Sequence, residues 1–201
     1  GDNEGLVLPP RVAPVQLCII PIQQKKEGVL DKAYELKDIL SKVARVKVDD
    51  TDKTPGWKFS EAEMRGYPLR LEIGPKDIEA GKCVLVRRDT REKIEVALDE
   101  VAARVPELLE TMQKEMLERA RAHRDAHTYT ATSYDEFKKV FTEKSGFVKA
   151  MWCGCKECEE QIKADLSVTS RCIPFKQETL SDVCVCCGKP AQKMVYWGRA
   201  Y

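Results

Sequence analysis

The sequence has 201 residues, of which 33% are charged and 43% hydrophobic, and its formal net charge is +1. This composition is that of a globular protein with one large or two small domains. No apolar run approaches the roughly 20 residues that a membrane-spanning helix needs, and the first residues, GDNEGLVLPPRV, lack the basic start and apolar stretch of a signal peptide. We therefore expect a cytoplasmic protein without a membrane partner.

Strands that alternate with helices are predicted over the first 100 residues. A helix is expected at 28–43, where apolar residues recur at helical spacing, and strands are expected at 15–22, 45–50, 69–74, 83–89 and 93–98. The alternating pattern of 69–74 predicts a half-buried strand, which Pro75 should end before 76–81 turn the chain. Segment 60–66 is expected to form one or two helical turns, with Ser60 as N-cap and Glu63 at the capping-box position. The pattern favours a mixed sheet covered by helices.

A long amphipathic helix is predicted next, from Asp99 to about Ala126. Its apolar stripe indicates core packing and consists of Val101, Val105, Leu108, Met112 and Met116. We expect this helix to bridge two domains. A second unit should begin near Ser133, with helices at 133–141 and 157–166, a strand at 147–153 and a closing strand at 193–201.

Nine cysteines are the most informative residues. Three are isolated and are expected to be small buried hydrophobic residues: Cys18, Cys83 and Cys172. The other six form two clusters, Cys153-Gly-Cys-Lys-Glu-Cys158 and Cys184-Val-Cys-Cys187-Gly188. An odd total, clustered in this way, favours a metal site over disulfides.

Two close pairs of cysteine thiolates favour zinc, because zinc binds four ligands in a tetrahedral arrangement. The preferred ligands are Cys153, Cys158, Cys184 and Cys187, with Cys155 and Cys186 as the alternatives in the two clusters. Four protein ligands leave no position for water, so the zinc should be structural. His123 and His127 lack a third ligand and are expected to be exposed polar residues.

Three blocks of the sequence together resemble prolyl-tRNA synthetases whose chain carries a zinc-containing C-terminal extension. They are GDNEGLVLPPRVAP at the start, PGWKFSEAEMRGYPLRLEIGPKD at 55–77, and RCIPF with CVCCGKPA and WGRAY at the end. The resemblance implies an α/β fold in which an anticodon-binding domain with a mixed sheet is followed by a small α+β zinc-binding domain. The implied parts are the end of a class II catalytic domain (1–14), the anticodon-binding domain (15–100), a connecting helix (101–130) and the zinc-binding domain (131–201).

The same resemblance implies functional residues. Arg11 corresponds to the arginine that holds ATP in the third class II signature. The residues matching those that read the two anticodon guanines of tRNA(Pro) are Phe59, Glu63, Arg70, Lys76 and Asp77. The carboxylate of Tyr201 would be directed toward the active site. The whole enzyme would activate proline with ATP and magnesium, attach it to tRNA(Pro), and dimerise through its catalytic domain.

The first two class II signatures do not occur in the sequence. We therefore expect this chain to bind the anticodon and support the catalytic domain, but not to form prolyl-adenylate by itself. Two alternatives remain open. One is a non-catalytic RNA-binding module of the same fold, and the other is a zinc-stabilised interaction domain without an RNA role.

Overall fold

The computed structural model describes residues 1–199 and separates the chain into two compact units, residues 1–118 and the part that begins at residue 119. The boundary falls within α4 (Val101–Ala126), which therefore contributes to both units. Within the described residues, every helix is too short or too polar to cross a membrane. Each unit has its own sheet and its own apolar core.

The first unit is built on a five-stranded mixed sheet with the strand order β2-β1-β3-β4-β5. β1 pairs in parallel with both β2 and β3, whereas β4 and β5 continue the sheet in antiparallel pairing. The strands are β1 (Leu17–Pro21), β2 (Val46–Val48), β3 (Leu69–Ile73), β4 (Lys82–Arg87) and β5 (Lys93–Ala97). The predicted mixed sheet is confirmed.

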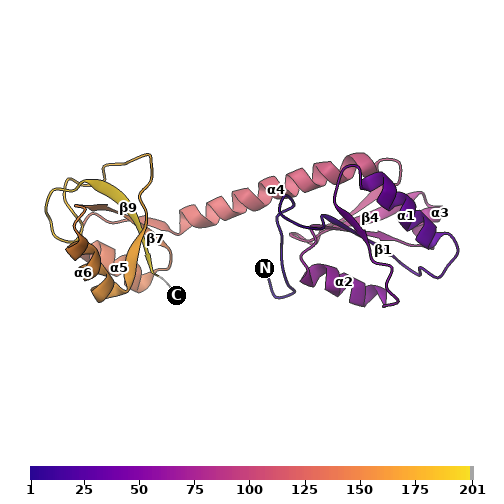
Figure 1. Cartoon of the computed structure of the whole chain (residues 1–201), viewed down its shortest axis with the longest axis horizontal. Coiled ribbons are helices and arrows are strands. Elements are labelled where there is room, and N and C mark those ends of the chain that lie inside the picture. Colours follow the sequence, from indigo (N-terminus) through magenta and orange to yellow (C-terminus); the bar gives the residue numbers. More distant parts are fainter. Residues whose placement is uncertain (200–201) are drawn as a thin grey trace. The chain divides into compact units, whose positions relative to one another are not determined.

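Helices cover both faces of this sheet, with α1 and α2 on opposite sides (Figure 1). The main core lies under α1 (Val29–Leu40) and the first half of α4, and receives Leu69 and Leu71 from β3. α2 (Pro55–Met64) packs on the other face, over Cys18 and Ile20. Successive residues of a strand point to opposite faces, so Arg70 and Glu72 lie on the α2 side. This placement creates the polar cluster described below.

Three local predictions for this region were wrong. α2 begins at Pro55 rather than near Ser60, because the hydroxyl of Thr54 accepts a bond from Trp57 N at 3.4 Å and proline is well suited to the first helical position. The strand at 69–73 is buried on both faces. Pro75 does not lead into a simple turn but begins a short helix, α3 (Pro75–Glu79).

The second unit is a smaller layer of two helices against a four-stranded sheet with the order β6-β7-β9-β8. Its core is buried between the sheet and the helices, with Phe137, Val148, Ile162 and Trp197 fully buried. Ser133 caps the predicted helix α5, and its hydroxyl accepts a bond from Glu136 N at 3.3 Å. The elements are β6 (Thr128–Thr130), α5 (Tyr134–Glu143), β7 (Phe147–Trp152), α6 (Lys156–Leu166), β8 (Val168–Cys172) and β9 (Lys193–Arg199).

Two of these strands, β6 and β8, were not predicted from the sequence. Both are edge strands of short length and polar composition, so the alternation that marks a buried strand is missing. Cys172, at the end of β8, is exposed, and the prediction that it is buried was wrong. Cys18 and Cys83 are buried as predicted, and burial raises the pKa of the Cys18 thiol to about 12 and that of Cys83 to about 11.

Candidate functional sites

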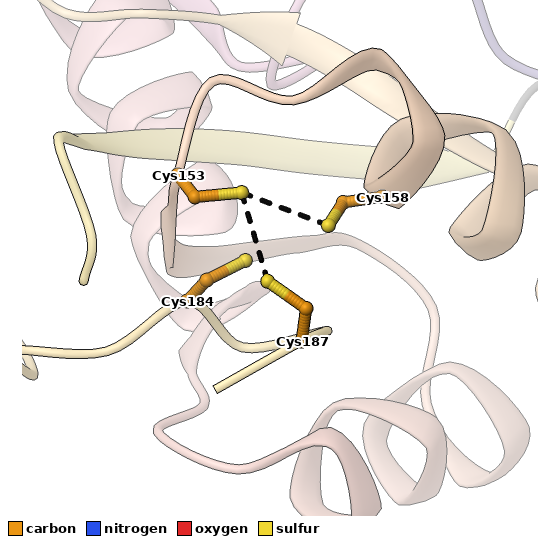
Figure 2. Close-up of side chains that lie close together, drawn as sticks. All are labelled: Cys153, Cys158, Cys184 and Cys187. Carbon is orange, nitrogen blue, oxygen red and sulfur yellow. Dashed lines mark hydrogen bonds between the residues drawn. The ribbon is translucent and has the colours of Figure 1, made fainter. Parts of the chain in front are cut away.

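Four cysteine sulfurs of the second unit point toward one another (Figure 2). The Sγ atoms of Cys153, Cys158, Cys184 and Cys187 all lie within 4.8 Å of one another. The distance from Cys153 Sγ is 3.6 Å to Cys158 Sγ and 3.7 Å to Cys187 Sγ. Sulfurs at about 2.3 Å from a tetrahedral metal are separated by about 3.8 Å. The arrangement therefore fits the ligand shell of a single metal ion.

Tight backbone turns bring each pair of sulfurs together. β7 ends at Trp152, and the chain turns at Gly154, with φ of 85°, before α6 begins. In the second pair, Cys184 N donates to Lys189 O at 2.7 Å, and Gly188 N donates to Cys184 O at 3.0 Å. Gly188 has a φ of 70°, a left-handed conformation that glycine adopts without strain. This turn returns Cys187 to the side of Cys184.

Cys155 and Cys186, the alternatives considered from the sequence, lie at the margin of this group. Cys155 is the N-cap residue of α6, and its carbonyl accepts a bond from Trp152 Nε1 at 3.2 Å. Cys186 packs against the apolar core of the second unit. Neither belongs to the set of mutually close sulfurs. The structure thus brings together the four preferred cysteines.

The cysteine group packs against Trp152, Cys155 and Cys186. Cys153, Cys158 and Cys184 are buried, and Cys187 is exposed. Burial, and then bonds to neighbouring thiols, raises the pKa of Cys158 well above its usual range. Thiols must lose their protons to bind a metal, so a bound cation is the group that would stabilise these sulfurs as thiolates.

A second cluster of functional side chains lies in the first unit, between α2 and β3. The Arg70 side chain is only 9% exposed, and its Cζ atom lies 4.3 Å from the centre of the Phe59 ring. Arg70 donates from NH1 to Glu63 Oε1 and from Nε to Glu72 Oε1, each at 2.9 Å. A buried guanidinium needs such partners, because an unpaired buried charge is strongly unfavourable.

Glu63 connects this cluster to solvent. Its side chain is 36% exposed, and of its two carboxylate oxygens only Oε1 accepts a hydrogen bond from a described residue. The cluster borders a hollow of about 120 Å³. Part of the wall of this hollow is formed by Glu63, Tyr67, Arg70, Val86, Arg88 and Lys93. The hollow therefore offers a carboxylate oxygen that a ligand can reach, beside the firmly held Arg70 and the Tyr67 ring.

Lys76 and Asp77 lie elsewhere, on α3 beyond the end of β3. Asp77 Oδ2 accepts a bond from Gly74 N at 2.8 Å, and Lys76 is exposed. Arg70 and Gly74 are four strand positions apart, which is about 13 Å at a rise of about 3.3 Å per residue. The structure therefore brings together Phe59, Glu63 and Arg70 but places Lys76 and Asp77 at the opposite end of the strand.

Sequence reasoning missed Glu72 as a member of the cluster. It is buried, and its carboxylate holds the inner side of the Arg70 guanidinium. The available signal was the Arg-x-Glu spacing, which puts both side chains on the same face of a strand. The prediction of a half-buried strand hid this signal, because it assigned both residues to solvent.

Arg11 lies in the segment before β1 and packs along α4. Its guanidinium pairs with Glu110 at 2.9 Å, and its backbone N donates to Gln113 Oε1 at 3.0 Å. The Arg11 side chain is 69% exposed, and an exposed ion pair of this kind contributes little stability. The guanidinium is therefore accessible to an anionic ligand. Tyr201, whose carboxylate was expected at an active site, lies outside the described residues.

Comparison with known proteins relates both units to one enzyme family. Residues 16–108 match the family described as "Anticodon binding domain", and residues 134–201 match "Prolyl-tRNA synthetase, C-terminal". The sequence is 68% identical to a proline–tRNA ligase of Lachnospira eligens, 66% to one of Lachnoclostridium phytofermentans and 62% to one of Clostridium novyi. Each match covers 100% of this chain and 42% of the relative. The chain thus spans less than half the length of these relatives.

Proposed function

The chain belongs to the prolyl-tRNA synthetase family and joins its anticodon-binding domain to its C-terminal domain, and from this premise we propose that it binds the anticodon of tRNA(Pro). The observation that carries the proposal is that Glu63, Arg70 and Tyr67 line one hollow of the first unit, with Phe59 behind Arg70. Unpaired anticodon bases are recognised by stacking and by hydrogen bonds to their edges. Glu63 and Arg70 would supply hydrogen bonds to a base edge, and the Tyr67 ring would supply a surface for stacking.

The chemistry of the cluster suits guanine. Guanine presents N–H donors on its Watson–Crick edge, which the free Oε2 atom of Glu63 would accept. Its O6 atom is an acceptor that suits an arginine donor, and Glu72 holds the Arg70 guanidinium in a fixed position for this contact. Lys76 and Asp77 lie on α3, beyond Gly74, and would contact the second guanine rather than the first.

Binding of an anticodon stem-loop tests this proposal. The stem-loop of tRNA(Pro) is compared with a variant in which both anticodon guanines are adenines, by fluorescence anisotropy. We expect Glu63→Gln to reduce the preference for guanine by about 1–3 kcal/mol, the range for one good base contact. Glu61→Gln is the matched control, because Glu61 lies on the same helix but pairs with Arg65. Equal binding of both RNAs by the unmodified chain would contradict anticodon reading.

We also propose that Cys153, Cys158, Cys184 and Cys187 hold a structural zinc ion. The support is the set of sulfur separations, which match a tetrahedral thiolate site. Zinc bound in this way would stabilise the fold of the second unit and would take no part in a reaction step. Elemental analysis should find about one zinc per chain, and a value near zero would remove this part of the proposal.

For the longer protein, we infer proline–tRNA ligation in the cytoplasm, the activity named in the relatives. Such an enzyme would activate proline with ATP and magnesium and would work as a homodimer. Arg11 would bind ATP, because a guanidinium presents a fork of donors to phosphate. The test is ATP–pyrophosphate exchange. The 201-residue chain should show none, and Arg11→Ala in an enzyme of the relatives' full length should lose most of the exchange rate.

A further inference from the structure

Among the described residues, one of the cations that line the hollow beside the Arg70 cluster has no carboxylate partner. The hollow lies on the α2 side of the sheet and extends over β3, β4 and the first residue of β5. Its lining includes four arginines and Lys93. A charged lining on a sheet face is expected either to be neutralised internally or to meet a charged ligand.

All four arginines are neutralised internally. Each forms an ion pair with a carboxylate of the first unit, and the pairs are Arg70 with Glu63 and Glu72, Arg87 with Asp89, Arg88 with Asp2, and Arg91 with Glu4. Their charges are therefore largely cancelled before any ligand arrives. These arginines form part of the wall of the hollow but add little net positive charge to it.

Lys93 differs from these arginines. It is exposed at the start of β5, and among the described residues no carboxylate forms an ion pair with it. The strand pairing fixes its position, because Val86 is the partner of Arg70 on one side and of Lys93 on the other. Lys93 and Arg70 are thus two strands apart, which is about 10 Å. Their side chains face the same hollow.

We propose that Lys93 binds a backbone phosphate of the anticodon strand while the Arg70 cluster reads a guanine. This inference rests on the anticodon-binding function proposed above. In a nucleotide strand, the sugar separates the base edge from the phosphate. Arg70 and Lys93 are separated in a similar way by β4, so one could contact the base and the other the phosphate of the same or the next nucleotide. A lysine suits a phosphate because its ammonium is a compact point charge. Such a contact positions the strand and carries no sequence information.

The salt dependence of binding distinguishes a phosphate contact from a solvated surface charge. Each phosphate neutralised on a single strand contributes about −0.7 to the slope of log K against log salt. Lys93→Met should therefore make the slope shallower by about 0.7. When salt is lowered from 1 M to 0.1 M, the variant should gain about fivefold less affinity than the unmodified chain. The preference for guanine over adenine should stay unchanged, because the base contacts remain. Lys93→Arg should restore the slope.

The experiment uses the 201-residue chain and the tRNA(Pro) anticodon stem-loop at several NaCl concentrations. Lys42→Met is the matched control, since Lys42 is exposed after α1, on the other face of the sheet, and should leave the slope unchanged. Thermal unfolding of each variant checks that the fold is intact. If the chain prefers guanine but Lys93→Met keeps the full slope, only the phosphate contact is overturned. If the unmodified chain shows no preference for guanine, the proposed anticodon function fails, and this inference fails with it.

Discussion

The two units of this chain are stabilised in different ways. The first unit has a sheet covered on both faces and a core that includes residues of β1, α1, β3, β4 and α4. Its buried arginines, such as Arg70, are paired with carboxylates of the same unit, and buried Lys58 donates to Gln24 Oε1 and Asp49 O. The second unit has a smaller core and, next to it, a separate group of mostly buried cysteines that packs against Trp152, Cys155 and Cys186. The buried arginines of the first unit are neutralised by its own carboxylates, whereas the cysteine group of the second unit has the arrangement of a metal site.

The difference shows how domain size and fold stability are related. A small domain buries a smaller fraction of its surface and often depends on a metal or disulfide for stability. In the second unit, the free energy of metal binding would be part of the free energy of folding. The fold of the first unit is stabilised instead by apolar burial and by internally paired charges. Four predictions test this comparison, in order of decreasing effect.

Removal of metal should have the largest effect and should be confined to the second unit. Chelation, or Cys184→Ser, is expected to unfold this unit because structural zinc sites contribute about 10–16 kcal/mol of apparent binding free energy at pH 7. Hydrogen exchange followed by mass spectrometry would show lost protection in the β7 and β9 peptides. Cys172→Ser is the control, since Cys172 is exposed and outside the sulfur group. An equal loss of protection in β1 and β3 would contradict the prediction that the metal stabilises only the second unit.

Removal of the Arg70 charge should destabilise the first unit by a smaller amount. Arg70→Met leaves the buried Glu72 carboxylate without its partner, and breaking a buried pair in this way costs about 3–5 kcal/mol. Urea unfolding monitored by exchange in β3 measures the effect. Arg65→Met, which breaks the exposed pair with Glu61, should cost at most about 1 kcal/mol. The double variant with Glu72→Met should recover most of the loss, and failure to do so would show that the charge pair is not the cause.

The start of α2 gives a third, local prediction. Thr54→Ala removes the side chain that caps the helix and should cost about 1 kcal/mol. Ser60→Ala should have almost no effect, because Ser60 lies inside the helix rather than at its cap. Thermal unfolding of the two variants side by side makes the measurement. A larger effect of Ser60→Ala would restore the sequence-based helix start.

Acid should weaken the first unit slightly through Asp2. A bond from the Arg88 side chain holds the pKa of Asp2 well below its usual range. A carboxyl whose pKa is lowered by folding stabilises the fold above its unfolded pKa, which is about 3.9, and loses this contribution as the pH falls through the folded value. Asp2→Asn should therefore show a shallower loss of stability below about pH 5. Asp38→Asn, at an exposed position on α1, is the control and should follow the unmodified chain.

Much of the fold was predictable because the relevant signals are local. Apolar periodicity identified α1, α4 and the strands of the first sheet, and the spacing of the two cysteine clusters identified the candidate metal ligands. These patterns are properties of neighbouring residues, and the chain displays them before it folds. The edge strands β6 and β8 show no such pattern, since their place in the sheet depends on pairing with β7 and β9.

The sequence by itself therefore determined the alternating strands and helices, the two cysteine groups, and the residues that match the family's anticodon motif. Only the tertiary structure decided which of those residues share a site. The packing of α2 on the sheet brought Glu63 and Phe59 to Arg70, and strand pairing set Lys93 across the same hollow. Lys76 and Asp77 lie on α3, beyond the far end of β3. Turns at Gly154 and Gly188 brought four of six clustered sulfurs within reach of one another. The reason is physical: contacts between distant segments depend on register and packing, which act through space and leave no mark on local spacing.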